Sequence, residues 1–436
     1  MPSHPPRSSS RVCGSSDRGA ARRSIRRRLV AGACLGFAGL GAGPAAAQIN
    51  LQADWVRDNQ LREYQAKGAR VGSFELFPEL RQIVVYDDNI FRQPDVELDD
   101  FIFLTRPSVD VRRKSARLTL EGSATANVLR FADTPQENLE TYQVNGDATY
   151  RVNRVHSFTA GGGYNRGFEN RADPESEDDI TEPPTLIDVG DIEVGYRYRP
   201  GRFGLATEAS WQRANFLSDV DADRDTDTFR ASARGLIGLS SRIDAFVEGF
   251  TVTRDARTDV DRTGVNRDSD TYGANVGVAV AVTEKINGQV FVGFFDFNPD
   301  DPTLEGFTDV SAGANLRWAP RDGTNVDFNV FRGDVGTIQN GANGRVDTRF
   351  NVGVTQVLRR NLRVRAQAGL NRRLFRAAGD GPDLRQRDLT AGVGAELAIS
   401  RNVAVEFNYN YNTRQADLFD DEFSAHRVGV GLALKI

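Results

Sequence analysis

Along the last four-fifths of the chain, short segments alternate apolar and polar residues. The final segment shows this most clearly, because every second position from 428 to 436 is apolar. Successive side chains of a β-strand point to opposite faces, so such a segment has one apolar and one polar face. The apolar positions are Val428, Val430, Leu432, Leu434 and Ile436, and the positions between and before them are Arg427, Gly429, Gly431, Ala433 and Lys435.

Eighteen segments of this kind follow one another, and they predict an all-β fold. We expect a transmembrane, antiparallel, up-and-down β-barrel of about 18 strands, with 16 strands as the alternative. The expected strands cover about residues 80–91, 100–112, 116–131, 138–151, 156–168, 186–199, 203–216, 226–238, 243–254, 270–282, 286–297, 306–319, 325–332, 345–357, 362–375, 386–399, 402–412 and 424–436.

The connectors between these segments alternate in length. Tight turns occur at residues 200–201, 240–241, 321–323 and 400–401, and longer acidic connectors occur at residues 173–184, 219–227, 255–270, 298–305 and 417–422. Short turns on one side and long loops on the other are typical of an outer-membrane barrel. An even number of strands also places both termini on the short-turn side, which is the periplasm.

The two faces of each strand fit a barrel in a membrane. In one strand, the alternate positions from Leu362 to Leu370 are apolar and would face lipid, while Arg363, Arg365 and Gln367 would face the lumen. About ten residues at roughly 3.3 Å each, tilted near 40°, give an apolar band of roughly 25 Å. Closure removes the unpaired strand edges that hydrocarbon cannot satisfy. Phe246, Phe250, Phe291 and Phe295 fall on the inward face, where they would pack against a plug or narrow the pore unless the register slips there.

The first residues have a different character. Arginines at 22–28 precede an apolar stretch at 29–40, and Ala45-Ala46-Ala47 offers small residues for a signal peptidase. We therefore expect a cleaved signal peptide at residues 1–47, with a retained membrane anchor as the alternative. Residues 48–78 would form a periplasmic N-terminal segment, and residues 79–436 the transmembrane β-barrel.

Removing the signal changes the composition. Both cysteines, Cys13 and Cys34, lie within it, so no disulfide or thiolate metal site is expected in the mature chain. Eight of the 55 basic residues and one of the 60 acidic residues are also lost, so the mature chain is more acidic than the net charge of −5 for the full sequence. Nucleic acid is therefore not an expected partner.

The region from Gly68 resembles a known family. The residues that carry the resemblance are Gly68, Val71, Gly72, Phe74, Leu76 and Pro78, then Tyr86-Asp87-Asp88-Asn89-Ile90-Phe91, Asp100-Phe101 and Arg106-Pro107. They are similar to the entry strands of the outer-membrane β-barrel porin type 2 family, most strongly over residues 68–131. The resemblance implies a Gram-negative outer-membrane barrel, with relatives that look like exopolysaccharide-associated barrels. The chain ends in Ile436, whereas barrel-assembly signals usually end in an aromatic residue.

Metal and catalytic chemistry have weak sequence support. Asp87, Asp88 and Asn89 could ligate calcium, but a capped turn explains them equally well and is favoured. The acidic residues between Asp219 and Asp225 mimic calcium-loop spacing, yet Arg224 stands where that loop needs glycine. We expect no metal site and no cofactor.

Two histidines, His156 and His426, remain after the signal. His426 is close to Ser424 in the sequence, but a third catalytic partner is not evident, so an enzyme is not expected.

Function is therefore expected to reside in the lumen, because a barrel of this size leaves an aqueous channel unless it is plugged. Charges of both signs recur on the inward face, and their mixture would favour neither ion strongly. They either line a pore or only stiffen the wall. The predicted pore-lining residues are Arg106, Arg117, Arg151, Arg197, Arg230, Arg234, Arg317, Arg349, Arg363, Arg365, Glu121, Asp147, Glu193, Glu208, Asp309, Asp347 and Glu396.

The leading hypothesis is a porin-like channel for passive diffusion of small hydrophilic solutes. The alternatives are a conduit for exopolysaccharide export and a non-conducting structural or adhesion barrel. Expected partners are outer-membrane lipid, lipopolysaccharide and the barrel-assembly machinery, with small solutes or polysaccharide inside the barrel. The sequence leaves open the oligomeric state, and whether the loop at 173–184 folds inwards.

Overall fold

The computed structural model describes residues 64, 66–95, 97–173, 175–176, 180–283, 285–379, 381–417 and 422–436. The predicted signal peptide and nearly all of the segment before residue 64 lie outside these residues. Two short 3₁₀ turns, Pro135–Glu137 and Ala222–Arg224, are found in loops. No helix among the described residues is long and apolar enough to cross a membrane.

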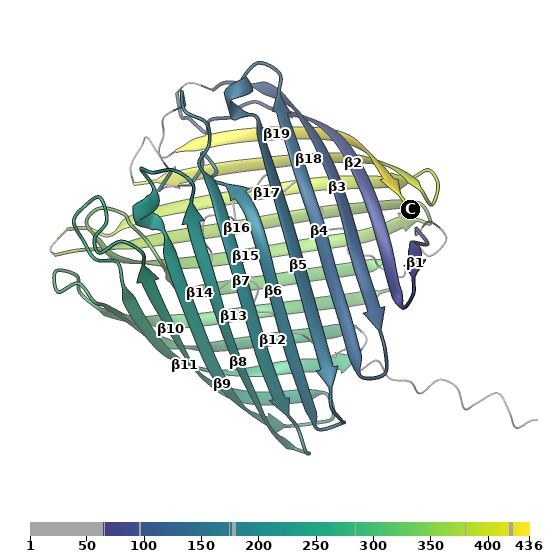
Figure 1. Ribbon diagram of the computed structural model, residues 1–436, viewed down its shortest axis with the longest axis horizontal. Coiled ribbons are helices and arrows are strands. Elements are labelled where there is room, and N and C mark those ends of the chain that lie inside the picture. Colours follow the sequence, from purple (N-terminus) through teal and green to yellow (C-terminus); the bar gives the residue numbers. More distant parts are fainter. Residues whose placement is uncertain are drawn as a thin grey trace, which may run out of the picture. The chain divides into compact units, whose positions relative to one another are not determined.

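Eighteen long antiparallel strands, β2 to β19, form a single closed barrel (Figure 1). Consecutive strands pair along the whole chain, and β19 pairs with β2 to close the ring. The predicted barrel of about 18 strands is therefore confirmed. Its strands are β2 Phe74–Asp87, β3 Asp100–Lys114, β4 Leu118–Phe131, β5 Leu139–Arg151, β6 His156–Phe168, β7 Leu186–Tyr198, β8 Phe203–Phe216, β9 Thr226–Gly238, β10 Ile243–Ala256, β11 Ser269–Thr283, β12 Ile286–Pro299, β13 Phe307–Arg321, β14 Thr324–Val335, β15 Ala342–Arg359, β16 Leu362–Ala377, β17 Leu384–Ala398, β18 Val403–Ala416 and β19 Phe423–Lys435.

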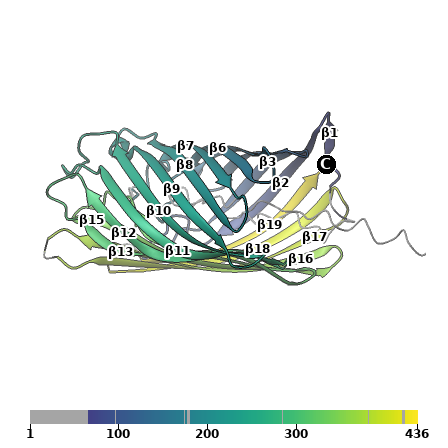
Figure 2. The same ribbon diagram turned by 90° about the horizontal axis from the view of Figure 1, so that it is seen from below.

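The connectors alternate between short and long, as predicted. The turns after β3, β5, β7, β9, β11, β13, β15 and β17 contain at most four residues, and the connectors at the other end are longer. The longest, residues 169–185, joins β6 to β7. Figure 2 shows the strands side by side around the ring, with the loops gathered at one end.

The N-terminal boundary of the barrel differs from the prediction. Strand β2 begins at Phe74, so residues 74–78 belong to the sheet and not to the segment before it. A short strand, β1 Ala69–Val71, pairs with the first residues of β2 and supplies their hydrogen-bond partners. Gly72, in the turn between them, has a φ of 60°, a conformation that glycine adopts without steric cost.

The two ends of the described barrel meet. The Gly68 amide donates to the Ile436 carbonyl (3.2 Å), and the Ile436 amide donates to the Pro78 carbonyl (3.1 Å). Gly68 has a φ of 72°, and a Cβ there would lie 2.6 Å from the Leu76 carbonyl oxygen. Strands β1 and β19 pair with successive stretches of β2, and the close contact where they meet therefore requires glycine at position 68.

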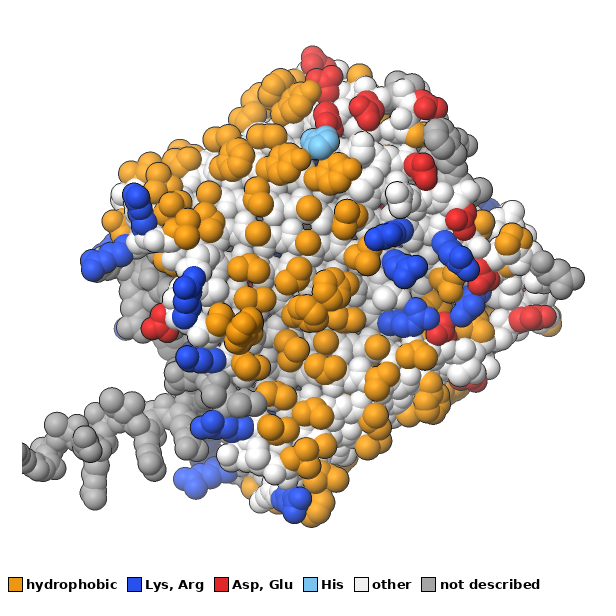
Figure 3. All heavy atoms as spheres, turned by 180° about the vertical axis from the view of Figure 1, so that it is seen from behind, with side chains coloured by type: hydrophobic (Ala, Val, Ile, Leu, Met, Phe, Trp, Pro, Cys, Tyr) orange, Lys and Arg blue, Asp and Glu red, His pale blue; other side chains and the backbone are white. Residues whose placement is uncertain are grey.

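The outer surface carries the apolar face of every strand. Val430 in β19 is 54% exposed and Val292 in β12 is 53% exposed, whereas the inward neighbours of Val430 are both glycines. Figure 3 shows apolar side chains covering the middle of one side of the barrel, with charged side chains gathered towards its ends. This distribution is the one that a lipid-embedded barrel requires.

A buried ion cluster lies at the closing seam between β2 and β19. The Asp87 carboxylate accepts hydrogen bonds from Arg92 of the following loop (2.7 and 2.9 Å) and from Arg427 of β19 (2.5 Å). Asn89 caps the turn, because its side chain accepts from the Gln93 amide (3.1 Å) and donates to the Ser424 carbonyl (3.0 Å). These contacts match the turn interpretation of this motif.

Candidate functional site: the lumen and its mouth

The alternation of each strand places the predicted lumenal residues on the face opposite the exposed apolar side chains. Most lie within strands, while Arg117 is in the turn before β4. Some come together in ion pairs, such as Arg234 with Glu248 and Arg317 with Asp327. Others lie alone. That they line a conducting pore stays a prediction.

Carboxylates form an arc on the inner wall of β4 to β8. Glu121 lies opposite Asp147 in the register, and Asp147 lies opposite Gly161, which in turn lies opposite Glu193. Asp191 and Glu208 extend the same inner face. Of these five, Glu121 contacts Lys114 at 3.3 Å, and the other four have no ion-pair partner among the described residues.

Glycines in β6 leave room for this acidic arc. A Cβ at Gly163 would lie 2.8 Å from both the Asn145 and the Asp191 side-chain oxygens, and one at Gly161 would lie 3.0 Å from the Asp147 carboxylate. The polar side chains of β5 and β7 therefore lean over the bare backbone of β6.

Arginines dominate the opposite wall, on β15 to β18. Strand β15 lies nine strands away from β6, which is halfway around the ring of eighteen. In contrast to the acidic arc, most of these arginines are paired. Their pairs are Arg345 and Arg349 with Asp347 (3.2 and 2.7 Å), Arg363 with Glu396 (2.5 Å), and Arg373 and Arg414 with Asp388 (2.6 and 2.7 Å).

The β6–β7 loop, residues 169–185, crosses the mouth of the barrel from one wall to the other. Glu175 in this loop forms an ion pair with Arg345 of β15 (3.2 Å) and accepts a hydrogen bond from Thr337 in the β14–β15 loop. Arg414 of β18 donates to the Ala172 carbonyl. Since Arg345 and Arg414 both point inwards, the loop enters the mouth and obstructs it.

Buried charges anchor the base of the β6–β7 loop. The Glu169 amide donates to the Thr185 carbonyl (2.8 Å), which closes the base. The Glu169 carboxylate is paired with Arg224 of the β8–β9 loop (3.0 Å to Oε2), and Arg224 stacks on Phe216 at 4.2 Å. Burial raises the pKa of Glu169 to about 7, although Arg224 opposes the shift.

Phenylalanines pack against glycines on the inner face of β10 to β13. Phe250 lies opposite Gly273, and Phe291 lies opposite Gly313. A Cβ at Gly273 would lie 2.2 Å from the Phe250 ring, and one at Gly313 would lie 2.3 Å from the Phe291 ring. The rings therefore lie flat along the wall, and the register does not slip at these positions.

The ends of β13 and β14 separate near the mouth. Their pairing stops at Ala312 and Arg332, whereas both strands continue beyond these residues. Asp334 of β14 accepts hydrogen bonds from Thr271 of β11 (2.9 Å) and from Arg254 of β10. The end of β14 therefore turns inwards and covers the inner faces of β10 to β12.

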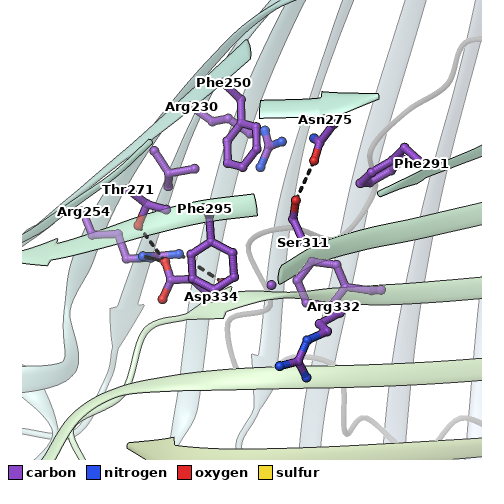
Figure 4. Close-up of a pocket in the computed structure, with 13 residues that line it drawn as sticks. Arg230, Phe250, Arg254, Thr271, Asn275, Phe291, Phe295, Ser311, Arg332 and Asp334 are labelled. Carbon is purple, nitrogen blue, oxygen red and sulfur yellow. Dashed lines mark hydrogen bonds and ion pairs between the residues drawn. The ribbon is translucent and has the colours of Figure 1, made fainter. Parts of the chain in front are cut away.

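A pocket of about 440 Å³ empty volume lies under this inturned end (Figure 4). Phenylalanine rings form much of its wall, and Asn275 and Ser311 hydrogen-bond across it at 2.6 Å. The Asp334 Oδ1 atom is buried and has no hydrogen-bond partner among the described residues. The lining residues are Arg230, Phe250, Val252, Arg254, Thr271, Asn275, Phe291, Phe295, Ser311, Phe331, Arg332, Gly333 and Asp334.

Both histidines among the described residues contact tyrosines. His156 Nδ1 is 2.8 Å from the Tyr196 hydroxyl, and His426 Nδ1 is 2.9 Å from the Tyr409 hydroxyl.

The acidic β8–β9 loop makes ion pairs, since Asp221 and Asp223 both contact Arg262 (3.0 and 2.9 Å). Its charges therefore hold neighbouring loops together. No group of three or more metal-ligating side chains occurs among the described residues.

Sequence reasoning missed several residues at the mouth. Arg345 and Arg414 lie at or just beyond the predicted strand ends, and extending the alternation by one or two residues would have placed both inwards. Glu175 and Asp334 had no such signal. Their roles depend on a loop crossing the barrel and on the end of β14 separating from β13 while it stays paired with β15.

A closed ring of amphipathic strands with an apolar exterior and a charged interior defines an outer-membrane β-barrel. The chain belongs to the family described as "Putative beta-barrel porin 2", whose model matches residues 62–436. This confirms the family resemblance found in the sequence.

Solved structures with a similar arrangement share little sequence with this chain. The outer membrane protein OpdK of Pseudomonas aeruginosa is 11% identical, with a TM-score of 0.43 over 83% of this chain and 99% of its own. OpdL of P. aeruginosa is 11% identical, with a TM-score of 0.41 over 84% and 100% of the two chains. The siderophore receptor PirA of Acinetobacter baumannii is 7% identical, with a TM-score of 0.42 over 82% and 80%. No curated protein matches the chain.

Proposed function

We propose that this protein is a passive diffusion channel for small hydrophilic solutes in the outer membrane of a Gram-negative bacterium. Its short turns and both termini would face the periplasm, and its long loops the exterior. The observation that carries the proposal is the inner wall, where charged side chains recur on the faces of the strands around the ring. A barrel with this number of strands is wide enough for an aqueous path.

The β6–β7 loop would set the size limit of this path. Its contacts with Arg345 and Arg414 hold it across the mouth, so solutes would pass beside it. The pore would also carry a transverse field, because the acidic arc on β4 to β8 faces the arginine wall on β15 to β18. Ordered water in such a field favours polar solutes over apolar ones of equal size.

The charge pairing differs between the two walls. Five arginines of the basic wall share the three carboxylates of Asp347, Asp388 and Glu396, so that wall keeps an excess of positive charge, while Asp147, Asp191 and Glu193 have no ion-pair partner among the described residues. Cations should therefore be enriched along the acidic arc and anions along the arginine wall, and the pore as a whole should favour neither ion strongly.

Planar-bilayer recording of the purified mature protein tests the proposal. We expect steady single-channel steps and a reversal potential, in a salt gradient, close to that of a pore that favours neither ion strongly. Liposome swelling with neutral sugars of increasing size should then give a size limit. Electrical silence from folded protein would contradict a channel and favour the structural or adhesion barrel instead. Loss of secreted polymer on gene deletion would favour the polysaccharide conduit.

A further inference from the structure

Three arginines form a cluster on the outer wall of the barrel, near its long-loop end. Arg372 of β16 lies directly opposite Arg387 of β17 in the register, and Arg385 is two residues before Arg387 in β17, on the side of the long loop. All three lie on the same face as the lipid-facing Leu370 and Leu389, and all three are exposed. We call them the outer arginine cluster.

These charges are not balanced by any residue that the structure describes. None of the three guanidinium groups has a hydrogen bond or ion pair among the described residues. The Asp417 carboxylate accepts a hydrogen bond from the backbone amide of Arg385 (2.9 Å), which does not involve the guanidinium group. Side chains directly opposite in an antiparallel pair are about 5 Å apart at Cβ, where like charges destabilise the sheet.

Other outward arginines near the long loops are arranged differently. Arg166 of β6 lies directly opposite Asp188 of β7, and the two form an ion pair (2.7 Å). Arg213 of β8 lies directly opposite Asp227 of β9, again as an ion pair (2.8 Å). In these two places the residue opposite the arginine on the neighbouring strand is an aspartate, whereas between β16 and β17 it is another arginine. A partner from outside the chain would supply the missing anion.

The height of the cluster indicates what that partner is. Below the Arg372–Arg387 pair, the outward positions of β16 and β17 are apolar down to the short turn. The cluster is therefore the first charged layer above the apolar band, at the level of lipid headgroups. The apolar cross-strand pairs are Leu370–Leu389, Ala368–Ala391, Ala366–Val393, Val364–Ala395 and Leu362–Leu397.

We infer that Arg372, Arg385 and Arg387 bind the phosphate groups of lipopolysaccharide in the outer leaflet. Guanidinium groups bind phosphate through paired, charge-assisted hydrogen bonds, and several around one phosphate also remove their mutual repulsion. Basic side chains gather beside the apolar surface on the side of the barrel shown in Figure 3. The choice of lipopolysaccharide rests on the long loops lying outside, as the proposed function has them.

Lipid binding to the mature protein in non-ionic detergent tests this site. The ligands are bisphosphorylated lipid A, its dephosphorylated form and phosphatidylglycerol. Wild type should bind the bisphosphorylated lipid most tightly, and Arg372→Gln/Arg387→Gln should weaken that binding about tenfold or more. The matched control is Arg166→Gln/Arg213→Gln, which removes the same two charges from paired positions. Its affinity for lipid A should match wild type.

Thermal unfolding gives a second test, in which a substitution that weakens lipid binding should increase the Tm of the lipid-free protein. Without lipid, Arg387→Glu should raise Tm, because it replaces the repulsion with a cross-strand ion pair. Added lipid A should raise the Tm of wild type but not that of this variant. Equal lipid A binding by wild type and the double variant, or equally tight binding of phosphatidylglycerol, would overturn the inference. Channel conductance in the same variants is independent of this site, so failure here would leave the proposed function standing.

Discussion

At the scale of single residues, the lumenal charges differ in whether they are paired. Arg363 and Arg365 belong to one strand and one inner face, yet Arg363 is buried against Glu396 while Arg365 has no ion pair among the described residues. Alternation in the sequence places both inwards but cannot tell them apart. Pairing depends on which strand is next to which and on side-chain reach across the ladder.

Neutralising the acidic arc should shift the ion selectivity of the pore towards anions. For Asp147→Asn/Glu193→Gln, the reversal potential in a salt gradient should shift towards that of an anion-preferring pore, because unpaired lumenal charges set the local ion concentration. The control is Arg365→Gln, which should shift the reversal potential the other way. Unchanged potentials in both variants would mean that these groups do not line the conducting path.

Glu169 makes the loop anchor depend on pH. Its pKa is about 7 in the anchored loop because of burial, with Asp173 and Asp221 adding to the shift and Arg224 opposing it, and a released loop would return to about 4.5. A raised carboxyl pKa means that the anchored state binds the proton more tightly. The anchor is therefore strongest below pH 4.5 and weakens as the pH rises to 7.

Limited proteolysis of the β6–β7 loop measures this dependence. Cleavage should be slower at pH 5 than at pH 8 once rates are corrected for protease activity on an unfolded substrate. Glu169→Gln keeps the hydrogen bond to Arg224 but cannot titrate, so its cleavage should not depend on pH in this range. Equal pH dependence in the variant would assign the effect to another group.

At the scale of elements, the strands were predictable and the mouth was not. The bounds of β6, β8 and β9 match the predicted segments at 156–168, 203–216 and 226–238, because turn residues interrupt the two-residue period at each end. The crossing of the β6–β7 loop depends on ion pairs between residues far apart in the sequence. The two-residue alternation of apolar and polar positions carries no information about such contacts.

Shortening the β6–β7 loop should widen the pore. Replacing residues 172–183 with a short glycine-serine linker removes the contacts to Arg345 and Arg414, so single-channel conductance and the swelling size limit should both increase. Replacing loop residues 378–379 with glycine and serine serves as the control, because the Ala378 amide donates to Gly341 of the β14–β15 loop and not across the mouth. A shortened loop with wild-type conductance would place the narrowest point elsewhere.

The glycine and phenylalanine pairs of the inner wall should be sensitive to added volume. Gly313→Ala places a methyl group 2.3 Å from the Phe291 ring, so the ring must move, and overpacking of this kind costs about 1–3 kcal/mol. The Tm in detergent should fall accordingly. Gly235→Ala is the control, since a Cβ there meets nothing within 4 Å. Adding Phe291→Leu to Gly313→Ala should recover part of the loss.

At the scale of the whole molecule, closure depends on one seam between strands from opposite ends of the sequence. Asp87 holds this seam by binding Arg92 and Arg427 at once, and all three groups are buried or nearly so. Asp87→Asn would leave two guanidinium groups without a carboxylate. Removing one partner of a buried ion pair costs about 3–5 kcal/mol.

Gel mobility after heating to increasing temperatures tests this seam, because a closed barrel migrates faster than its unfolded chain. Asp87→Asn should lose the fast band at a lower temperature than wild type. Asp88→Asn is the neighbouring control: its carboxylate accepts from the His426 amide (2.7 Å), a contact that the amide oxygen can keep. Equal melting of the two variants would assign the seam's strength to the backbone ladder.

The meeting of Gly68 with Ile436 has a consequence for how the ring can be connected. Since the two ends of the ladder are within hydrogen-bond reach, a short linker could join them, and the chain could be opened at the turn at residues 240–241 without changing any pair of adjacent strands. Such a circular permutant would keep every pair of hydrogen-bonded strands while changing which half of the barrel is synthesised first. The fold of the barrel would then depend on which strands are adjacent, and not on the point in the ring at which the described chain begins and ends.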